Sequence, residues 1–212
     1  MQFKEKDTVI FFGDSITACN KTNHEGASAK DVLGSGYVNM MNSHYLLYNP
    51  KLKLRIINQG ISGNRSVDLI ERLEKDVLSI KPNHVFLMIG INDAWRTLDN
   101  IQIPRFQTTL KDYQNNIDQL VKTMLNHSIN VILMSPFHLE PNRNDDLRKA
   151  VDSYNVFLKQ YAKQHNLLFI DLQSAFDELL KQTSVYVLSQ DRIHVNMAGH
   201  MFIKDTILKH IG

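Results

Sequence analysis

Two short motifs in this sequence carry the residue types of a nucleophile and a general base. Gly13-Asp14-Ser15 ends in a hydroxyl, and Asp191-Arg192-Ile193-His194 places a carboxylate three residues before an imidazole. That separation lets the aspartate reach one ring nitrogen while the other nitrogen faces the hydroxyl, which gives the imidazole the tautomer of a base. We therefore expect Ser15 to attack a carbonyl group, His194 to take its proton and Asp191 to orient the ring.

Two further motifs offer donors for the negative charge that such an attack creates. In the stretch Asn58-Gln59-Gly60-Ile61-Ser62-Gly63-Asn64 the backbone can approach a ligand closely, and Gly63 presents an N–H with no Cβ beside it. The amide of Asn92, within Gly90-Ile91-Asn92-Asp93, can also stabilise an oxyanion, as can the N–H of Ser15 itself. Each motif alone is more typical of a helix cap or a turn than of a catalytic site, so the argument depends on their agreement.

Other residues compete for these roles. Ser62 is a rival nucleophile, but the elbow of α/β-hydrolases needs Gly-x-Ser-x-Gly, and Ser62 runs directly into a glycine. His24 and His138 are rival bases. Neither has an acidic residue at a spacing of three, although Glu25 and Glu140 are near in sequence, so His194 ranks first.

The motifs follow short apolar runs that indicate buried strands. These runs are almost continuous in hydrophobicity rather than alternating, as expected when helices cover both faces of a parallel sheet. The five candidate strands are Thr8 to Phe12, Leu54 to Asn58, His84 to Ile89, Asn130 to Met134 and Leu167 to Asp171.

The segments between these runs repeat apolar residues at steps of three and four, which is typical of amphipathic helices. The expected helices cover Phe106 to Leu125, Val67 to Ile80 with Ser66 as N-cap, Val151 to Tyr161, and Met197 to Ile211. This alternation predicts a doubly wound α/β fold, a five-stranded parallel sheet with helices on both faces and ligands at the carboxyl ends of the strands. Ala18 to Ser35 lacks clear periodicity and is a candidate for part of the site wall.

Composition narrows the class of protein further. With 212 residues, 43% of them hydrophobic and 22% charged, residues 1–212 are expected to form one domain around one core. The net charge is +2, and the sequence contains no dense run of Lys and Arg residues. We therefore expect a small neutral or weakly charged substrate and neither nucleic acid nor a membrane as partner. The polar start, Met1 to Asp7, and the lack of an apolar run of about 20 residues predict a cytoplasmic protein.

The single cysteine, Cys19, excludes an intramolecular disulfide, a cysteine-based zinc site and a redox pair. It lies four residues after Ser15, and we expect a partly buried packing residue rather than a second nucleophile. Gly34-Ser35-Gly36 lacks the third glycine and the preceding strand of a dinucleotide-binding motif. We expect no metal and no cofactor.

In order along the chain, the four motifs resemble the four blocks of the SGNH (GDSL-type) serine hydrolases, over nearly the whole length. Ile16 stands where the family pattern has leucine, which is a conservative exchange. The resemblance implies a flavodoxin-like sandwich and a cofactor-free esterase that works through an acyl-enzyme. It also implies the roles of the residues: Ser15 as nucleophile, His194 as base, Asp191 as its partner, and the N–H of Ser15, the N–H of Gly63 and the side chain of Asn92 as oxyanion hole.

Three further stretches resemble the family branch that contains bacterial carbohydrate esterases, including acetylxylan esterases. They are Leu33 to Val38, Ile89 to Arg96 and Met134 to Phe137. This narrower resemblance implies an O-acetyl sugar as substrate and, because members of the branch are often oligomeric, a homo-oligomer. Trp95 would then either stack on a sugar ring or pack against the core. A lysophospholipase or thioesterase and a catalytically silent binding module are the alternatives.

Overall fold

The computed structural model of this chain describes residues 2–22 and 28–211. Five strands form one parallel sheet in the order β2-β1-β3-β4-β5. Their bounds are β1 Thr8–Gly13, β2 Arg55–Gly60, β3 His84–Met88, β4 Asn130–Met134 and β5 Leu168–Ile170. All five expected strands are therefore present, with ends that differ by at most two residues from the expected ones.

The central strands are apolar on both faces because helices cover both faces. Phe11 and Phe12 of β1 and Phe86 of β3 are fully buried, and the rings of Phe11 and Phe86 stack with centroids 4.7 Å apart. Gly13, the last residue of β1, lies beside Gly60 of β2 and Met88 of β3. Three strands thus end at one level, so the segments that follow them meet at one edge of the sheet.

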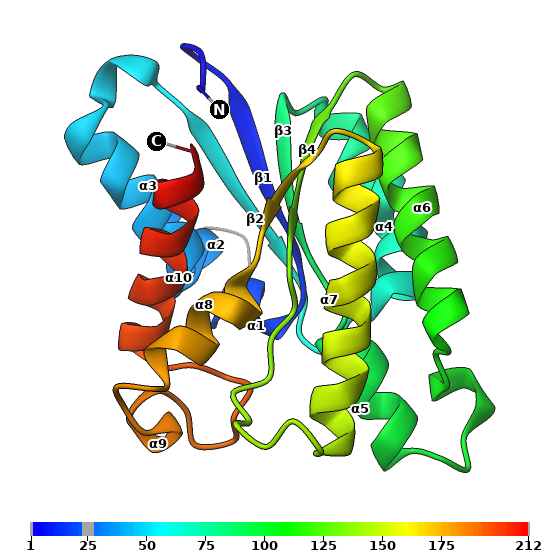
Figure 1. Cartoon of the computed structure of the whole chain (residues 1–212). Coiled ribbons are helices and arrows are strands. Elements are labelled where there is room, and N and C mark those ends of the chain that lie inside the picture. Colours follow the sequence, from blue (N-terminus) through cyan, green and yellow to red (C-terminus); the bar gives the residue numbers. More distant parts are fainter. Residues whose placement is uncertain (1, 23–27, 212) are drawn as a thin grey trace.

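Helices α3 and α10 lie on one side of the sheet and α4, α6 and α7 on the other, as Figure 1 shows. The helices are α1 Ser15–Ala18, α2 Ala29–Leu33, α3 Tyr37–Tyr48, α4 Ser66–Asp76, α5 Ile91–Asp99, α6 Leu110–Asn126, α7 Asp146–Gln164, α8 Leu172–Leu179, α9 Val185–Leu188 and α10 Met197–Ile211. Short 3₁₀ turns occupy Pro50–Leu52, Leu78–Ile80 and Pro104–Phe106. The predicted doubly wound α/β architecture is confirmed.

The starts of three helices, α4, α6 and α7, differ from expectation. Helix α6 begins at Leu110 and not at Phe106, because Thr109 and Asp112 form a capping box that fixes the start. Ser66 is the first residue of α4 rather than its N-cap, which is Arg65. The Ser66 hydroxyl donates instead to Asp93 at 2.5 Å, a partner from a distant segment that sequence periodicity does not reveal.

The helical segments that the sequence prediction missed are mostly short or weakly amphipathic. Helix α2 lies within Ala18 to Ser35, of which residues 23–27 are outside the described part. Helix α7 starts at Asp146, five residues before the expected Val151. Within residues 2–22 and 28–211, none of the helices combines the length and apolar character needed to cross a membrane.

Candidate active site

The turn from β1 into α1 presents Ser15 at the edge of the sheet. Asp14 is the N-cap of α1, and its carboxylate accepts a hydrogen bond of 3.0 Å from the N–H of Ile16. Ser15 is therefore the first residue of the helix and stays half-buried, while Asp14 behind it is 1% exposed. The hydroxyl is held at the surface by a turn that is itself buried.

The three predicted triad residues lie in one hydrogen-bonded series. The hydroxyl oxygen of Ser15 is 2.9 Å from Nε2 of His194, and Nδ1 of the same ring is 2.6 Å from a carboxylate oxygen of Asp191. An ionised carboxylate can only accept, so this network assigns the ring proton to Nδ1 and leaves Nε2 to accept from the hydroxyl. The arrangement has the geometry needed for proton transfer from Ser15 to His194.

Asp191 is held in its charged form. Partial burial opposes its ionisation, but hydrogen bonds from the His194 ring and from the N–H groups of Ile193 and His194 outweigh burial and keep the pKa of Asp191 well below its usual range. The carboxylate is thus negative across the pH range in which an imidazole titrates. A negative neighbour stabilises the imidazolium that forms when the ring takes a proton.

The loop carrying Asp191 and His194 is anchored to the segment after β4. Arg192 adopts a positive φ of 66°, and its carbonyl accepts a hydrogen bond of 2.8 Å from the N–H of Leu139. Its guanidinium forms an ion pair with the buried carboxylate of Glu140. Glu140, considered above as a neighbour of His138, therefore contacts the loop of His194 instead.

The expected oxyanion donors lie around the same cleft as Ser15. Gly63 has a φ of +83°, a conformation that glycine adopts without strain, within the turn closed by the N–H of Asn64 and the carbonyl of Ile61. Apart from its two chain neighbours, no atom of the described residues lies within 4 Å of the position that a Cβ on Gly63 would take, so that side of the residue is open. Asn92, in α5, is 4% exposed and donates one amide hydrogen to the carbonyl of Asn64 at 3.0 Å.

The cleft at this edge has a volume of about 500 Å³, a size suited to a small organic ligand. Trp95 lines this cleft and also packs against the core. Packing against the core therefore does not prevent Trp95 from stacking on a sugar ring. The guanidinium of Arg96 lies 5.1 Å from the centre of the Trp95 ring. The lining residues are Ser15, Ile16, Cys19, Asn20, Ser62, Gly63, Asn92, Trp95, Arg96, His194, Val195 and His200.

The competing residues have other surroundings. Ser62 lines the cleft, but the hydroxyl that lies against His194 is that of Ser15. Cys19 is partly buried, and burial raises the pKa of its thiol, which weakens it as a nucleophile. His138 is buried with Nδ1 3.6 Å from Asp145, a carboxylate that sequence spacing does not point to. His24 lies outside the described residues.

Beneath the cleft lie two buried carboxyl groups that the sequence analysis did not interpret. Burial raises the pKa of Asp14 to about 7, against the hydrogen bond from Ile16 and with a further contribution from Asp93. Burial also raises the pKa of Asp93 to about 6, although the N–H and hydroxyl of Ser66 donate to it. Asp93 thereby ties the start of α4 to α5 and supports the helix that carries Asn92.

One further lining residue, His200 on α10, was not foreseen. Its Nδ1 accepts a hydrogen bond of 3.3 Å from the N–H of Tyr37. Burial and then the charge of His194 lower the pKa of His200 to about 4, so the ring is neutral near pH 7. Only its place on the last helix after Asp191-Arg192-Ile193-His194 could have indicated that it faces the cleft. Within residues 2–22 and 28–211, no group of three His, Cys, Asp or Glu side chains is placed to hold a metal ion.

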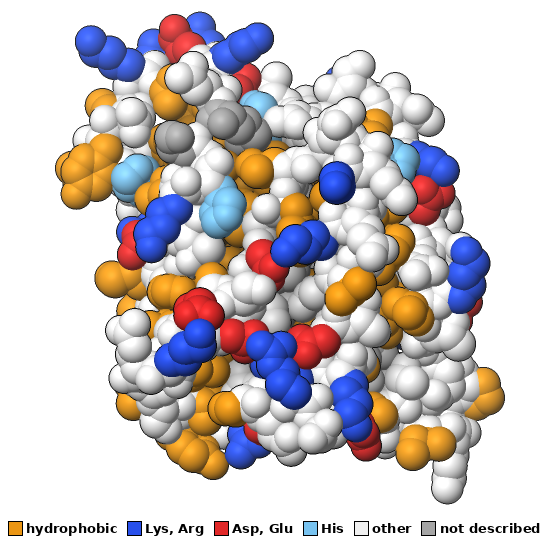
Figure 2. All heavy atoms as spheres, viewed as in Figure 1, with side chains coloured by type: hydrophobic (Ala, Val, Ile, Leu, Met, Phe, Trp, Pro, Cys, Tyr) orange, Lys and Arg blue, Asp and Glu red, His pale blue; other side chains and the backbone are white. Residues whose placement is uncertain are grey.

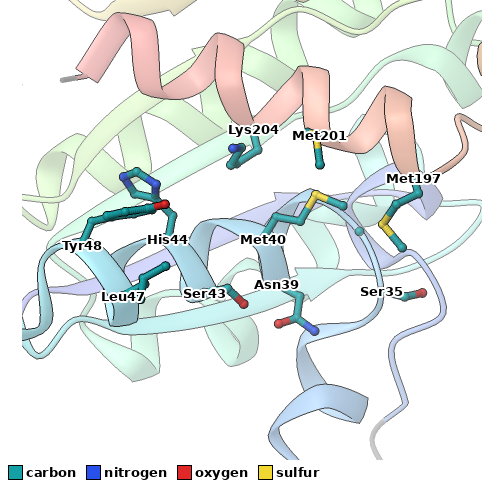
Figure 3. A pocket seen from close by; sticks show the side chains of 11 residues that line it. Ser35, Asn39, Met40, Ser43, His44, Leu47, Tyr48, Met197, Met201 and Lys204 are labelled. Carbon is teal, nitrogen blue, oxygen red and sulfur yellow. The ribbon is translucent and has the colours of Figure 1, made fainter.

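A second hollow, of about 440 Å³, lies between α3 and α10. Figure 3 shows its apolar wall, with Met40 and Leu47 on α3 and Met197 and Met201 on α10. Of the described triad residues none lines this hollow, so the chemistry predicted from the sequence belongs to the cleft at the sheet edge. On the face shown in Figure 2, basic and acidic side chains lie next to one another at the centre of the view, in line with the low net charge.

Comparison with known proteins decides the family. Residues 11–202 match the GDSL-like lipase/acylhydrolase family. The chain belongs to this family. The resemblance found in the four sequence motifs is thereby confirmed over most of the chain.

The relatives match almost the whole length of this chain and share its fold. The chain is 38% identical over 212 residues to an acetylxylan esterase of Geobacillus stearothermophilus, covering 100% of this chain and 97% of the relative. The crystal structure of Axe2, an acetylxylan esterase from that organism, matches with a TM-score of 0.94 over 100% of this chain and 97% of the other. LAE5, an α/β hydrolase enzyme from the metagenome of Lake Arreo, Spain, is 36% identical with a TM-score of 0.92, covering 98% and 96% of the two chains.

Several solved structures of Axe2 are of catalytic mutants. In these an aspartate, a serine or a histidine of Axe2 is replaced by alanine, and they match this chain with TM-scores of 0.94, 0.94 and 0.95. A serine, a histidine and an aspartate are also the residue types that meet in the cleft of this chain.

Proposed function

We propose that this protein is a serine esterase that removes acetyl groups from carbohydrates through an acyl-enzyme, with Ser15, His194 and Asp191 as its catalytic residues. The observation that carries the proposal is the hydrogen-bonded series from the Ser15 hydroxyl through the His194 ring to the Asp191 carboxylate. This series opens into a cleft large enough for a sugar residue.

The reaction begins when Ser15 attacks the ester carbonyl. The hydroxyl proton passes to Nε2 of His194, and the ionised Asp191 stabilises the resulting imidazolium. His194 then gives this proton to the departing alcohol, which leaves an acetyl group on Ser15. Water, activated by the same ring, attacks the acetyl-enzyme, and acetate and free Ser15 are released.

The tetrahedral intermediates in both halves of the reaction carry a negative oxygen. The N–H of Ser15 and of Gly63 and the side-chain amide of Asn92 are the proposed donors to it. All three residues line the cleft that Ser15 faces, and Asn92 is held in place by the carbonyl of Asn64. Donors fixed before the reaction stabilise the developing charge without a cost of reorganisation.

The substrate class is supported by the relatives and by the cleft. The relative from Geobacillus stearothermophilus is an acetylxylan esterase. Two of the apolar residues in the cleft, Ile16 and Val195, are 2% and 8% exposed and therefore offer little area for a long acyl chain. The half-buried Trp95 offers an aromatic face to a sugar ring, and polar side chains such as Asn20 line the same cleft.

A panel of acetyl esters with different alcohols tests this substrate class. Purified protein would be given acetylated xylo-oligosaccharides, triacetylglycerol and acetylcholine, with acetate release as the common readout. We expect the highest kcat/KM for the acetylated sugars. A preference of tenfold or more for the glycerol or choline ester would contradict the carbohydrate assignment, and no acetate release from any substrate would favour a silent binding module.

The expected homo-oligomer stays a prediction within this proposal. Exposed apolar side chains around the hollow between α3 and α10 are consistent with a contact surface, among them Leu47, Tyr48 and Met201. Light scattering of the purified protein would give the mass in solution.

A further inference from the structure

Arg72 has an environment that is unusual for a charged residue on the outer layer of the fold. It lies on α4, its side chain is only 12% exposed, and it lies over the ring of Phe12 at 4.4 Å. Its guanidinium donates four hydrogen bonds of 2.7 to 3.0 Å. Only one of the four acceptors is an acidic side chain, Asp76, one turn further along the helix.

Two of the other acceptors are backbone carbonyls at the ends of neighbouring strands. Nη2 of Arg72 donates to the carbonyl of Gly13 at 2.9 Å and to that of Gln59 at 3.0 Å. Gly13 stands two residues before Ser15, at the point where β1 turns into α1. Gln59 is the next-to-last residue of β2, and the turn that carries Gly63 follows directly after this strand. One side chain therefore joins the backbone segments that carry two of the proposed oxyanion donors.

The last acceptor links Arg72 to the third donor. Nε of Arg72 donates to the side-chain oxygen of Asn64 at 2.7 Å. Asn64 directly follows Gly63, and its carbonyl accepts the amide hydrogen of Asn92 at 3.0 Å. Asn64 thus connects the guanidinium of Arg72 to Asn92 by two hydrogen bonds, and a single peptide bond joins Asn64 to Gly63.

We propose that Arg72 is a positioning residue that sets the relative placement of the three oxyanion donors. This inference rests on the proposed function, because it concerns the oxyanion hole of that reaction. Arg72 is not among the residues lining the cleft, so it acts through Gly13, Gln59 and Asn64 rather than on the substrate. Donors on three separate segments stabilise an oxyanion only if their spacing is fixed, since a shift of about 1 Å can cost about a hundredfold in rate.

The chemistry of the side chain explains why arginine fits this position. The planar guanidinium has five N–H groups at fixed angles, and it can reach two carbonyls, an amide oxygen and a carboxylate at the same time. The ammonium group of lysine directs its donors from a single atom, so it cannot span acceptors on opposite sides of a guanidinium. A lysine at position 72 would keep the positive charge and lose the bridging.

The test compares Arg72→Lys and Arg72→Ala with a matched control. Arg65→Ala is that control, because Arg65 is 13% exposed, comes just before the same helix, and contacts Asp68 and the carbonyl of Arg105 instead of the cleft segments. For each folded variant kcat and KM would be measured with 4-nitrophenyl acetate, together with the rate of labelling by a fluorophosphonate.

We expect Arg72→Lys and Arg72→Ala to lower kcat by about a hundredfold, with KM changed by less than about threefold, and the labelling rate to fall in parallel. Arg65→Ala should keep kcat within about threefold of the wild type. Millimolar guanidinium chloride, compared with sodium chloride, should restore part of kcat in Arg72→Ala, because a free guanidinium can occupy the vacated site.

Other outcomes separate this inference from the proposed function. If Arg72→Ala does not fold, the kcat of Arg72→Lys tests the inference by itself. A kcat of Arg72→Lys equal to that of the wild type would overturn the inference. An equal loss of kcat in Arg65→Ala would show a general effect of stability and would overturn it as well. A wild-type protein that neither hydrolyses the acetyl ester nor reacts with the fluorophosphonate would instead refute the proposed function.

Discussion

The Ser15 hydroxyl lies 2.9 Å from Nε2 of His194, although 179 positions separate the two residues in the sequence. Ser15 follows the first strand of the sheet, whereas His194 stands on the loop before the last helix. In Figure 1 the start of α1 and the loop before α10 both lie in the lower half of the molecule, toward which the strands point. The parallel sheet thus brings the first and last motifs of the chain together.

Replacing the proposed side-chain donor should slow the chemical step more than it weakens binding. We expect Asn92→Ala to lower kcat by about 10²-fold or more, the usual scale for one oxyanion donor, with a smaller change in KM. Steady-state kinetics with an acetyl ester would measure both constants. An unchanged kcat in the folded variant would remove Asn92 from the oxyanion hole.

Replacing His194 should lower kcat more than replacing Asp191. His194→Ala removes the only proposed base, and a loss of kcat on the order of 10⁶-fold is expected. Asp191→Asn should be less severe, on the order of 10⁴-fold, because a ring without its negative partner can still accept a proton weakly. Rates of 4-nitrophenyl acetate hydrolysis would rank the two variants, and an equal and complete loss in both would indicate a larger role for Asp191.

Buried Asp14 predicts a stability that falls as the pH rises. The pKa of Asp14 is about 7 in the folded protein, against an ordinary value of 3.8, so the folded state holds this proton more tightly than the unfolded chain. Its contribution is fully present below pH 3.8 and is lost as the pH rises through about 7. Asp14→Asn keeps an acceptor for Ile16 and cannot ionise.

We therefore expect the free energy of unfolding of Asp14→Asn to rise relative to the wild type between pH 4 and pH 8, by an amount on the order of a few kcal/mol. Urea unfolding at several pH values would measure it. Asp112→Asn is the control, and its free energy of unfolding should change with pH in the opposite direction relative to the wild type. The reason is that the hydroxyl of Thr109 lowers the pKa of the exposed Asp112 carboxyl. If the difference in free energy of unfolding between Asp14→Asn and the wild type were the same at every pH, the proposed role of Asp14 ionisation would be refuted.

The size of the cleft predicts the preferred acyl group. A long acyl chain gains about 0.8 kcal/mol for each buried CH₂, and it needs an apolar groove beside the nucleophile to do so. The exposed part of the cleft near Ser15 consists largely of Asn20, Ser62 and Gly63. We expect kcat/KM to decrease from acetyl through butyryl to octanoyl 4-nitrophenyl esters, by about tenfold or more in total. A rise toward octanoyl would favour a lysophospholipase or thioesterase.

Much of this architecture could be predicted because the strands and several helices have a characteristic local pattern of apolar residues. Continuous apolar runs such as Asn130–Met134 predicted the strands within two residues, since a strand covered on both faces has no polar side. The helix Met197–Ile211 was predicted with its exact observed bounds. The motif residues Ser15 and His194 were recognisable because each follows or precedes such an element.

The rest depends on contacts between distant segments. Arg72 has the spacing of an ordinary solvent-facing charge on an amphipathic helix, and nothing local shows that it reaches Gly13, 59 positions away. Ser66 resembles an N-cap until the structure places Asp93 against its hydroxyl. These polar contacts satisfy buried groups across the sheet edge, and neither periodicity nor spacing encodes them.

The most direct measurement of the central claim is the site of covalent labelling. Wild-type protein treated with a fluorophosphonate should gain the mass of one adduct, which peptide mapping should place on Ser15. Ser15→Ala should keep the circular dichroism spectrum of the wild type, gain no adduct and lose nearly all esterase activity, because this hydroxyl is the proposed nucleophile and contributes little to packing. Labelling or turnover near the wild-type level in folded Ser15→Ala would contradict the account and place the nucleophile elsewhere.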